Sequence, residues 1–524
     1  MNNYKEMALA EYNSSTTTTR RSGTNGKAFW NVNSTQFMYA PQFYFPEIPG
    51  VAKDVYSATD SLGNTYSFES DSQMADLTPI WKDLAVGFVT LKVEAHHSFM
   101  NRTFLAGART FYKSAPFPGR DALPPLARTY AECAILAFKY VFECESSRYW
   151  LEKGVPDPEY YHNVYPSKTV SSLINAMVAY AELDSENREE ALKLASNAAD
   201  YVISITYGAD SKLEGVPPTY SFLGLNKEKV DENAPNAYGR RNTVMTIYPA
   251  SMGNAYLSLE KATGDSKYFE AARRIAEFYK ENVLPSGSWY LLVDAMTGEP
   301  AGQKNCCLHF GVLNFLHSFF VRTGEECWHE LETNYYRYIE KNSLENYNWE
   351  GQFEDAALTA NYSNLTHINA DQMISYISLN MSDDKEMLAE AETLMRFVED
   401  QFVVWGDHAP WNPHLGGGKY SYGDYWYSPA GLEQYGWYVP IDGSTITIIR
   451  AMIDLYSANK NPLLLEKACA LADSITRVQD PETGVIPTHW MARDCMKKLK
   501  NFWLNCHIGT AFGMMKIAKM LGEI

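Results

Sequence analysis

The sequence has no long hydrophobic run and little positive charge, and each absence excludes a class of function. No apolar stretch approaches the roughly 20 residues that a helix needs to cross a bilayer. The formal net charge is −18, so the chain lacks the basic surface that binding to nucleic acid phosphates requires. We therefore expect neither a membrane span nor a nucleic acid partner.

Motifs for metal or cofactor binding are also missing. The eight cysteines are scattered without a Cys-x-x-Cys spacing, and we expect mostly buried free thiols. There is no His-x-x-x-His or His-Glu-x-x-His motif, and Gly416–Gly418 is not followed by the Lys–Ser or Lys–Thr pair of a phosphate-binding loop. We expect no metal and no other cofactor.

The amino-terminal residues 1–27 are polar and contain no apolar stretch like that of a signal peptide. We expect a flexible tail over this range. The pattern fits a cytoplasmic protein, or a periplasmic or secreted one from which a signal was removed. The compartment and the oligomeric state stay open.

Residues 28–115 show the alternating pattern of β-strands. Two short runs, Val55–Asp60 and Thr65–Phe68, flank a Gly63–Asn64 turn, and Val86–Ala95 is a further strand candidate. This pattern predicts a β-sandwich-like accessory domain over 28–115.

From residue 116 to residue 524 the chain alternates between two kinds of helix. Helices that are apolar nearly all round are buried, whereas helices with a charged face meet water. The apolar helices are predicted to begin near Ser167, Pro249, Cys307, Asn369, Gly443 and Cys506. The charged helices are predicted to begin near Ala122, Glu186, Lys267, Cys327, Asp384 and Pro462. Six of each kind, outer first and inner last, predict a mainly α protein with a closed (α/α)6 barrel.

Loop lengths orient the predicted barrel. Links from inner to outer helices are short, as in Leu183–Glu186 and Thr263–Ser266. Links from outer to inner helices are long: 146–166, 208–248, 284–306, 342–368, 404–442 and 480–505. Long structured loops usually carry function, so we expect the site above the N-terminal ends of the inner helices.

Two of the long loops supply candidate catalytic carboxylates. Hydrolysis of a glycosidic bond usually needs two carboxyl groups, and the candidates are Glu354, Asp355 and Glu433. Capping of a short helix is an equally good interpretation of Glu354 and Asp355. Asp442 directly precedes Gly443 at a helix start, which favours a helix N-cap.

A basic cluster in the 208–248 loop stands out in so acidic a chain. Either Arg240 or Arg241, with Asn236 and Tyr238 nearby, could hold a substrate carboxylate in bidentate fashion. The alternative is an intramolecular ion pair with the acidic run at 231–232.

Aromatic residues make up 14% of the chain, with 36 Tyr and 12 Trp. Trp349, Trp437 and Tyr438 lie in the long loops and are candidate platforms for a sugar ring, although packing of the loops onto the barrel would also explain them. His309 and His367 lie on the same predicted face and complete the candidate substrate-binding set.

The hairpin alternation, together with Trp289-Tyr290, Asp294 and Thr297-Gly298, resembles the six-hairpin glycosidase superfamily over about residues 122–524. The loop blocks 217–220, 349–355 and 433–442 look like those of its bacterial glycan-degrading members. The resemblance implies a carbohydrate-active enzyme, in a group that includes unsaturated and ordinary β-glucuronidases. Polysaccharide lyases and sugar epimerases share the architecture, so the fold alone does not choose the reaction.

The leading hypothesis is an exo-acting glycoside hydrolase that acts on an oligosaccharide or polysaccharide of plant or host origin, at a glucuronic acid residue. One alternative is a uronate lyase or C5-epimerase, with Tyr238, His309, His367 and Asn236 available for proton transfer. The other is a non-catalytic glycan-binding protein.

Overall fold

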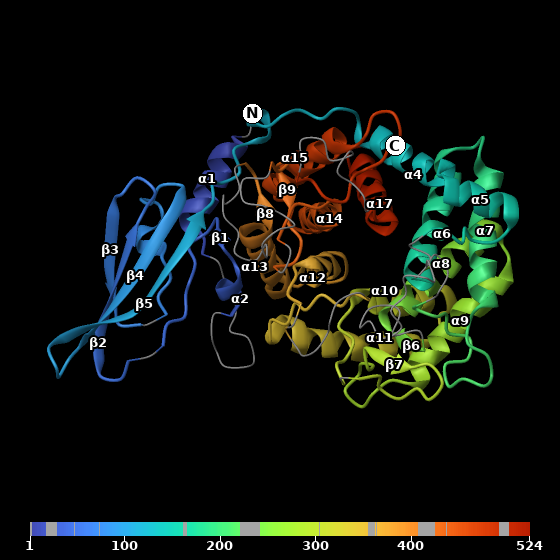
Figure 1. The fold of residues 1–524 in the computed structure, drawn as a ribbon, viewed down its shortest axis with the longest axis horizontal. Coiled ribbons are helices and arrows are strands. Elements are labelled where there is room, and N and C mark those ends of the chain that lie inside the picture. Colours follow the sequence, from blue (N-terminus) through green and yellow to red (C-terminus); the bar gives the residue numbers. More distant parts are fainter. Residues whose placement is uncertain are drawn as a thin grey trace.

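The computed structural model describes residues 3–16, 29–46, 48–72, 74–160, 165–220, 242–302, 304–354, 362, 364–406, 425–435, 438–491 and 502–524. These residues form a small β-sheet beside a large helical barrel (Figure 1). Among their helices, none combines the length and hydropathy that a membrane crossing needs. The seven cysteines in these ranges are free thiols.

The described part of the barrel has six inner and six outer helices. The inner helices are α6 (Pro166–Leu183), α8 (Ile247–Thr263), α10 (Phe310–Thr323), α12 (Ile368–Asn380), α14 (Asp442–Asn459) and α17 (Leu504–Met520). The outer helices are α4 (Tyr130–Glu143), α7 (Arg188–Ser204), α9 (Ser266–Glu281), α11 (Glu326–Ile339), α13 (Lys385–Phe402) and α15 (Pro462–Val478). Two short helical segments, α5 (Glu145–Lys153) and η5 (Glu340–Glu345), follow outer helices.

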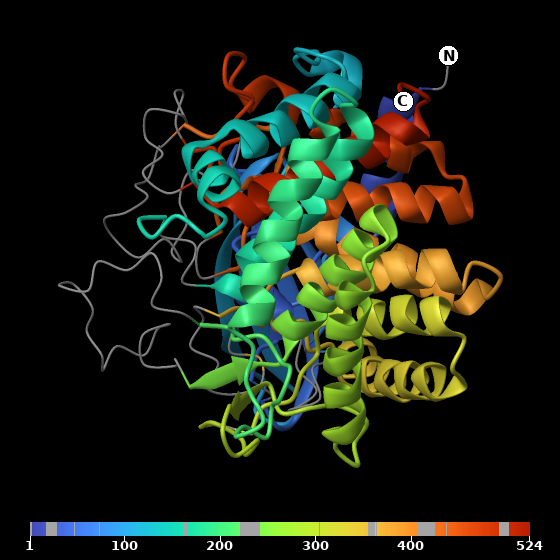
Figure 2. The same ribbon diagram turned by 90° about the vertical axis from the view of Figure 1, so that its right-hand side faces the viewer.

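The ring of helices closes on itself. Each inner helix contacts the next along the chain, and α17 contacts both α6 and α4 at the start of the barrel. Neighbouring hairpins, coloured from teal to yellow, lie side by side in Figure 2. The predicted (α/α)6 barrel is therefore confirmed.

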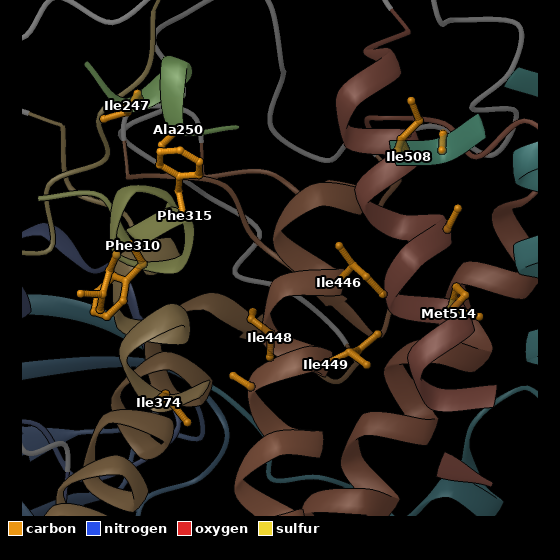
Figure 3. Packing of buried hydrophobic residues seen from close by; sticks show 14 of the residues in the cluster. Ile247, Ala250, Phe310, Phe315, Ile374, Ile446, Ile448, Ile449, Ile508 and Met514 are labelled. Carbon is orange, nitrogen blue, oxygen red and sulfur yellow. The ribbon is translucent and has the colours of Figure 1, made fainter. Parts of the chain in front are cut away.

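Small residues let the inner helices approach one another. A Cβ atom added to Gly253 of α8 would overlap the Phe315 ring of α10, and one added to Gly513 of α17 would overlap Ile446 of α14. Phe315 points toward Ala250 of α8 in the core shown in Figure 3. Interiors are packed as densely as organic crystals, so these positions leave no room for a larger residue.

Eleven of the twelve predicted helix starts lie within three residues of the observed starts. The exception is the first outer helix, predicted near Ala122. Only a short 3-10 turn, Arg120–Ala122, lies there, and α4 begins at Tyr130 after a capping box formed by Thr129 and Glu132. Pro124 and Pro125 separate the two, because proline lacks the N–H that a helix interior needs.

The N-terminal region contains one sheet rather than the expected sandwich, within the residues described. Its elements are α1 (Tyr4–Ser14), α2 (Phe29–Asn33), β1 (Gln36–Phe37), β2 (Val51–Thr59), β3 (Thr65–Ser70), α3 (Thr78–Trp81), β4 (Gly87–His97) and β5 (Arg102–Lys113). The strand order is β1-β5-β4-β2-β3, with β1 parallel to β5 and the other pairs antiparallel.

A single sheet suffices because only one of its faces is apolar. That face packs against Trp81 and Leu84, in and just after α3. The other face carries hydroxyl pairs across neighbouring strands, such as Ser57 with Ser67 and Thr90 with Thr110. Alternating strands of an antiparallel sheet can place one face in water, so no second sheet is required.

The N-terminal region is joined to the barrel at the end of α13. Asp400 Oδ1 accepts hydrogen bonds from the backbone N–H groups of Met38 and Tyr39, each at 2.7 Å. The neighbouring Glu399 accepts the Tyr39 hydroxyl at 3.1 Å. Trp30 of α2 packs edge-on against Phe397 of α13. This joint combines apolar packing with hydrogen bonds to charged groups, which are stronger than neutral ones.

The segment expected to be a flexible tail includes a packed helix. Helix α1 buries Ala8 and Tyr12, and its Glu11 accepts a hydrogen bond from Lys467 of α15 at 2.8 Å. Lys467 also binds Glu399 at 2.7 Å, with side chains only 2% and 3% exposed. The expectation over 1–27 is thus corrected for residues 4–14, because a buried lysine needs these acidic partners. Residues 17–28 lie outside the described ranges.

We expect Lys467→Met to destabilise the fold by about 3–5 kcal/mol, because it leaves the buried Glu399 carboxylate without its cation. Urea unfolding followed by circular dichroism would measure the change. The matched control is Lys267→Met, since Lys267 pairs with Asp200 where both side chains are nearly half exposed. That change should cost at most about 1 kcal/mol. Equal effects of the two substitutions would contradict the importance of the buried pair.

Candidate functional site

The N-terminal ends of the inner helices bring a group of polar side chains together. Lys168 lies in the first turn of α6, Tyr248 in the first turn of α8, and Asp442 is the first residue of α14. Glu354 precedes α12, and Cys506 lies in the first turn of α17. The barrel therefore collects at one face residues that are far apart in the sequence.

Glu354 is held by a cation and a hydroxyl group. Its Oε1 atom lies 2.5 Å from Lys168 Nζ, and its Oε2 atom accepts the hydroxyl of Tyr248. The Tyr220 hydroxyl donates to its backbone carbonyl at 3.2 Å. The residue is only 2% exposed. The buried ion pair and the Tyr248 hydrogen bond fix the position of this carboxyl group.

Asp442 is fully buried and is the most perturbed carboxyl group of the site. It accepts hydrogen bonds from the Gly443 N–H at 2.7 Å and from the Thr510 hydroxyl at 3.2 Å. Burial raises the pKa of Asp442 well above its ordinary value, and the charge of Glu433 raises it further. The raised pKa favours the protonated, neutral form of Asp442 over the range in which an ordinary aspartate is ionised. The N-cap of α14 is Ile441, so the N-cap expectation for Asp442 is corrected by one position.

Glu433 lies just after the short strand β9 (Ala430–Gly431), which pairs with β8 (Val403–Val404). The Glu433 N–H donates to the Val439 carbonyl at 2.9 Å, and the residue is 8% exposed. Of the three described carboxyl groups of the site, it is the most accessible.

The thiol of Cys506 marks the point around which these groups gather. Burial raises the pKa of this thiol well above its ordinary value. Glu433 and Glu354 raise it further, Asp442 does so where it is ionised, and Lys168 lowers it. All four groups therefore act on one place. The described residues hold no group of three or more His, Cys, Asp and Glu side chains arranged for a metal.

His309 is the N-cap of α10 and presents a neutral ring. Its Nδ1 atom accepts the Gly311 N–H at 2.9 Å, and burial lowers its pKa to about 4. Since Nδ1 accepts, the proton of the neutral ring lies on Nε2. Gln352 accepts the N–H of Leu308 at 2.9 Å and so links this helix start to the segment of Glu354. His309 can donate a hydrogen bond to a substrate oxygen, as a substrate-binding residue would.

His367 has a different position from the one expected. It is fully buried, with Nδ1 2.7 Å from Asp371 Oδ2 and Nε2 3.1 Å from the Leu432 carbonyl. Both ring nitrogens are engaged, so the substrate-binding expectation is corrected. The ring instead fixes the backbone next to Glu433.

Trp349 and Tyr438 are not sugar platforms in this structure. Trp349 is 0% exposed and packs edge-on against Tyr347, and Tyr438 is 1% exposed and donates to the Gln401 carbonyl. Both expectations are corrected: these rings pack loops onto the barrel. The remaining candidates, Asn236, Tyr238, Arg240, Arg241, Asp355 and Trp437, lie outside the described residues and stay predictions.

Four residues of the site were not predicted from the sequence: Lys168, Tyr248, Cys506 and Thr510. One signal could have found most of them. Lys168, Tyr248 and Cys506 are polar or ionisable residues in the first turn of helices that are otherwise apolar. Such groups are costly to bury, so their presence there indicates a functional or strongly paired role.

No family model matches this sequence, and neither does any curated protein. Solved structures do match. A cellobiose 2-epimerase from Spirochaeta thermophila is 13% identical, with a TM-score of 0.51 over 75% of this chain and 97% of that chain. A family 76 glycoside hydrolase from a bovine Bacteroides thetaiotaomicron strain is 9% identical, with a TM-score of 0.47 over 89% and 93%.

An unsaturated glucuronyl hydrolase specific for heparin is 11% identical, with a TM-score of 0.45 over 75% of this chain and 97% of that chain. At such low sequence identities, structural similarity shows the fold alone. The match to the epimerase confirms the predicted fold: this chain has a six-hairpin (α/α)6 barrel.

The raised pKa of Asp442 predicts a distinct effect of pH on stability. Above about pH 4 the unfolded chain ionises this group while the folded chain holds its proton to a higher pH, so its contribution to stability falls as pH rises toward the raised pKa. An asparagine side chain is neutral at all these pH values and mimics the protonated form of Asp442. Asp442→Asn should therefore raise the Tm near pH 7, and the gain should shrink as the pH is lowered toward about 4.

Asp184 is a control of opposite sign. Hydrogen bonds from Tyr180 and Asn187 lower the pKa of Asp184 to about 2, so Asp184→Asn should lower the Tm near pH 7. Thermal unfolding at several pH values would measure both. A loss of stability in Asp442→Asn that grows with pH would contradict the protonated state.

Proposed function

We propose that the protein is a glycan-acting enzyme that hydrolyses a glycosidic bond, with Asp442 as general acid and Glu433 as the second catalytic carboxylate. The observation that carries the proposal is the fully buried carboxyl group of Asp442, whose pKa is raised by burial and by the charge of Glu433. Glycoside hydrolysis uses two carboxyl groups, and environments that separate their protonation states assign the acid and the base.

The reaction follows from these positions. Asp442 gives its proton to the leaving glycosidic oxygen, which removes negative charge from the departing group. Glu433, as a carboxylate, either takes a proton from the attacking water or attacks the anomeric carbon itself. Glu354 contributes through its ion pair with Lys168, which holds the two side chains in place to bind sugar hydroxyl groups.

The competing reactions fit the site less well. A lyase or epimerase needs a base that removes a proton from carbon. His309 carries its proton on Nε2 because Nδ1 accepts a backbone N–H, so the ring acts as a donor rather than a base. A glycan-binding protein gains nothing from a buried acid, which costs free energy to keep. Hydrolysis, in contrast, uses the two carboxyl groups of Asp442 and Glu433.

The finer proposal is exo-action at a glucuronic acid residue of a plant or host glycan. Its support is the sequence cluster at 236–241, where Arg240 or Arg241 would hold the uronate carboxylate.

Substitution of the carboxyl groups tests the reaction. Asp442→Asn and Glu433→Gln should each lower kcat by about 100-fold to 10,000-fold, because each removes a proton-transfer or nucleophilic group. Glu354→Gln should lower kcat/KM, since it breaks the pair with Lys168. The assay is incubation with a panel of glycan oligosaccharides, with products read by mass for the gain of one water.

Glu325→Gln is the control, because Glu325 pairs with Arg273 on the outer surface, and it should leave the rates unchanged. Full activity in Asp442→Asn and Glu433→Gln would end the proposed acid–base assignment.

Uronate recognition is tested separately. Arg240→Met and Arg241→Met should raise KM for a β-glucuronide by about 10-fold or more in at least one variant, because a charged hydrogen bond of about 1.5–3 kcal/mol is lost. KM for the matching neutral β-glucoside should not change. Parallel rises for both substrates would contradict a uronate clamp.

A further inference from the structure

We infer that the N-terminal domain, the region from α1 to β5, positions the candidate site, because Asn31 and Gln401 hold the residues 430–435 and 438–441 on either side of Glu433 and before Asp442. The inference rests on the proposed function for its kinetic readout. Asn31 belongs to α2 of the N-terminal domain, and Gln401 lies in the last turn of α13. Both residues are fully buried.

Gln401 contacts the N-terminal domain and the site segment at once. Its Nε2 atom donates to Asn31 Oδ1 at 2.7 Å. Its Oε1 atom accepts the Tyr435 hydroxyl, and its backbone carbonyl accepts the Tyr438 hydroxyl. One glutamine therefore ties the two tyrosines that follow Glu433 to a residue of the other domain.

The direction of these hydrogen bonds is fixed from the N-terminal side. Asn31 Nδ2 donates to the Gln42 carbonyl at 2.7 Å, so Asn31 Oδ1 must face Gln401. Gln401 Nε2 then faces Asn31, and Gln401 Oε1 is left to accept from Tyr435. Neither amide can turn over without leaving a buried polar group unpaired, which costs about 1–3 kcal/mol.

We call the hydrogen bonds that link Asn31, Gln401, Tyr435 and Tyr438 the relay. The backbone at Tyr438, which the relay holds, is strained. Tyr438 has φ of 36°, in the left-handed region that non-glycine residues rarely adopt. Such a conformation costs on the order of 1–3 kcal/mol and persists only where surrounding contacts impose it. The Tyr438 N–H donates to the Gln434 carbonyl at 2.7 Å, and the Glu433 N–H donates to the Val439 carbonyl at 2.9 Å. The strained Tyr438 thus directly precedes Val439, whose carbonyl accepts the Glu433 N–H.

Packing supports the same relay. Trp30 of the N-terminal domain lies with its ring centroid 5.7 Å from that of Tyr435, and its indole N–H donates to the Tyr347 carbonyl at 2.9 Å. His367 holds the opposite side of the segment through the Leu432 carbonyl. Glu433 is therefore placed between a support from the barrel and a support from the N-terminal domain.

The test uses the full chain with Gln401→Met and Asn31→Leu, which keep side-chain volume and remove the amide groups. A misplacement of about 1 Å at a catalytic group can cost on the order of 100-fold in rate. We expect kcat to fall by about 10-fold to 100-fold while KM changes less than about two-fold, because neither residue touches substrate. Hydrogen exchange of peptides covering 430–441 should become faster in both variants.

Lys113→Met is the matched control. Lys113 is buried in the N-terminal domain and donates to the backbone of Trp81 and Leu84, and it is not a partner in the hydrogen bonds between Asn31, Gln401 and Tyr435. This change should lower stability while leaving kcat and exchange in 430–441 unchanged.

Unchanged kcat in an active enzyme, or unchanged exchange in 430–441, would overturn the inference, as would equal effects in Lys113→Met. A wild-type chain that cleaves no glycan would instead defeat the proposed hydrolysis. In that case the exchange measurement alone decides whether the N-terminal domain positions the segment.

Discussion

The buried ion pair between Lys467 and Glu399 joins three parts of the chain that are distant in sequence. Lys467 comes from α15, Glu399 from α13, and the pair is completed by Glu11 of α1 and the hydroxyl of Tyr39. Charges so deeply buried are stable only when each has a partner. The buried charged groups at the end of α13 therefore have all their partners only when the N-terminal residues are packed against them.

The next two residues of α13 extend this joint toward the candidate site. Asp400 binds the backbone at Met38 and Tyr39, and Gln401 binds Asn31 on one side and the tyrosines after Glu433 on the other. Three consecutive side chains at one helix end thus serve docking and site geometry together. A helix end suits this use, because its last carbonyl groups have no partner within the helix.

Burial determines how the two carboxyl groups of Asp442 and Glu354 differ. The carboxyl groups of Asp442 and Glu354 lie at the N-terminal ends of inner helices, where apolar packing excludes water. Burial raises the pKa of Asp442, whereas Glu354 forms a buried ion pair with Lys168. The two carboxyl groups thus have different surroundings, and such a difference allows them different roles.

The sequence by itself determined the barrel, since helices that are apolar nearly all round and helices with a charged face differ in their hydrophobic pattern and alternate six times along the chain. It also placed Glu354 and Glu433 on the working face, because only one class of link is long. It could not assign Lys168, Trp349, His367 or Asp442. Whether a polar residue is paired, and whether an aromatic ring is exposed, depends on neighbours hundreds of residues away. The single sheet, the packed helix α1 and the relay through Gln401 were likewise decided only by tertiary contacts, because hydrogen bonds between distant segments leave no periodic pattern in the chain.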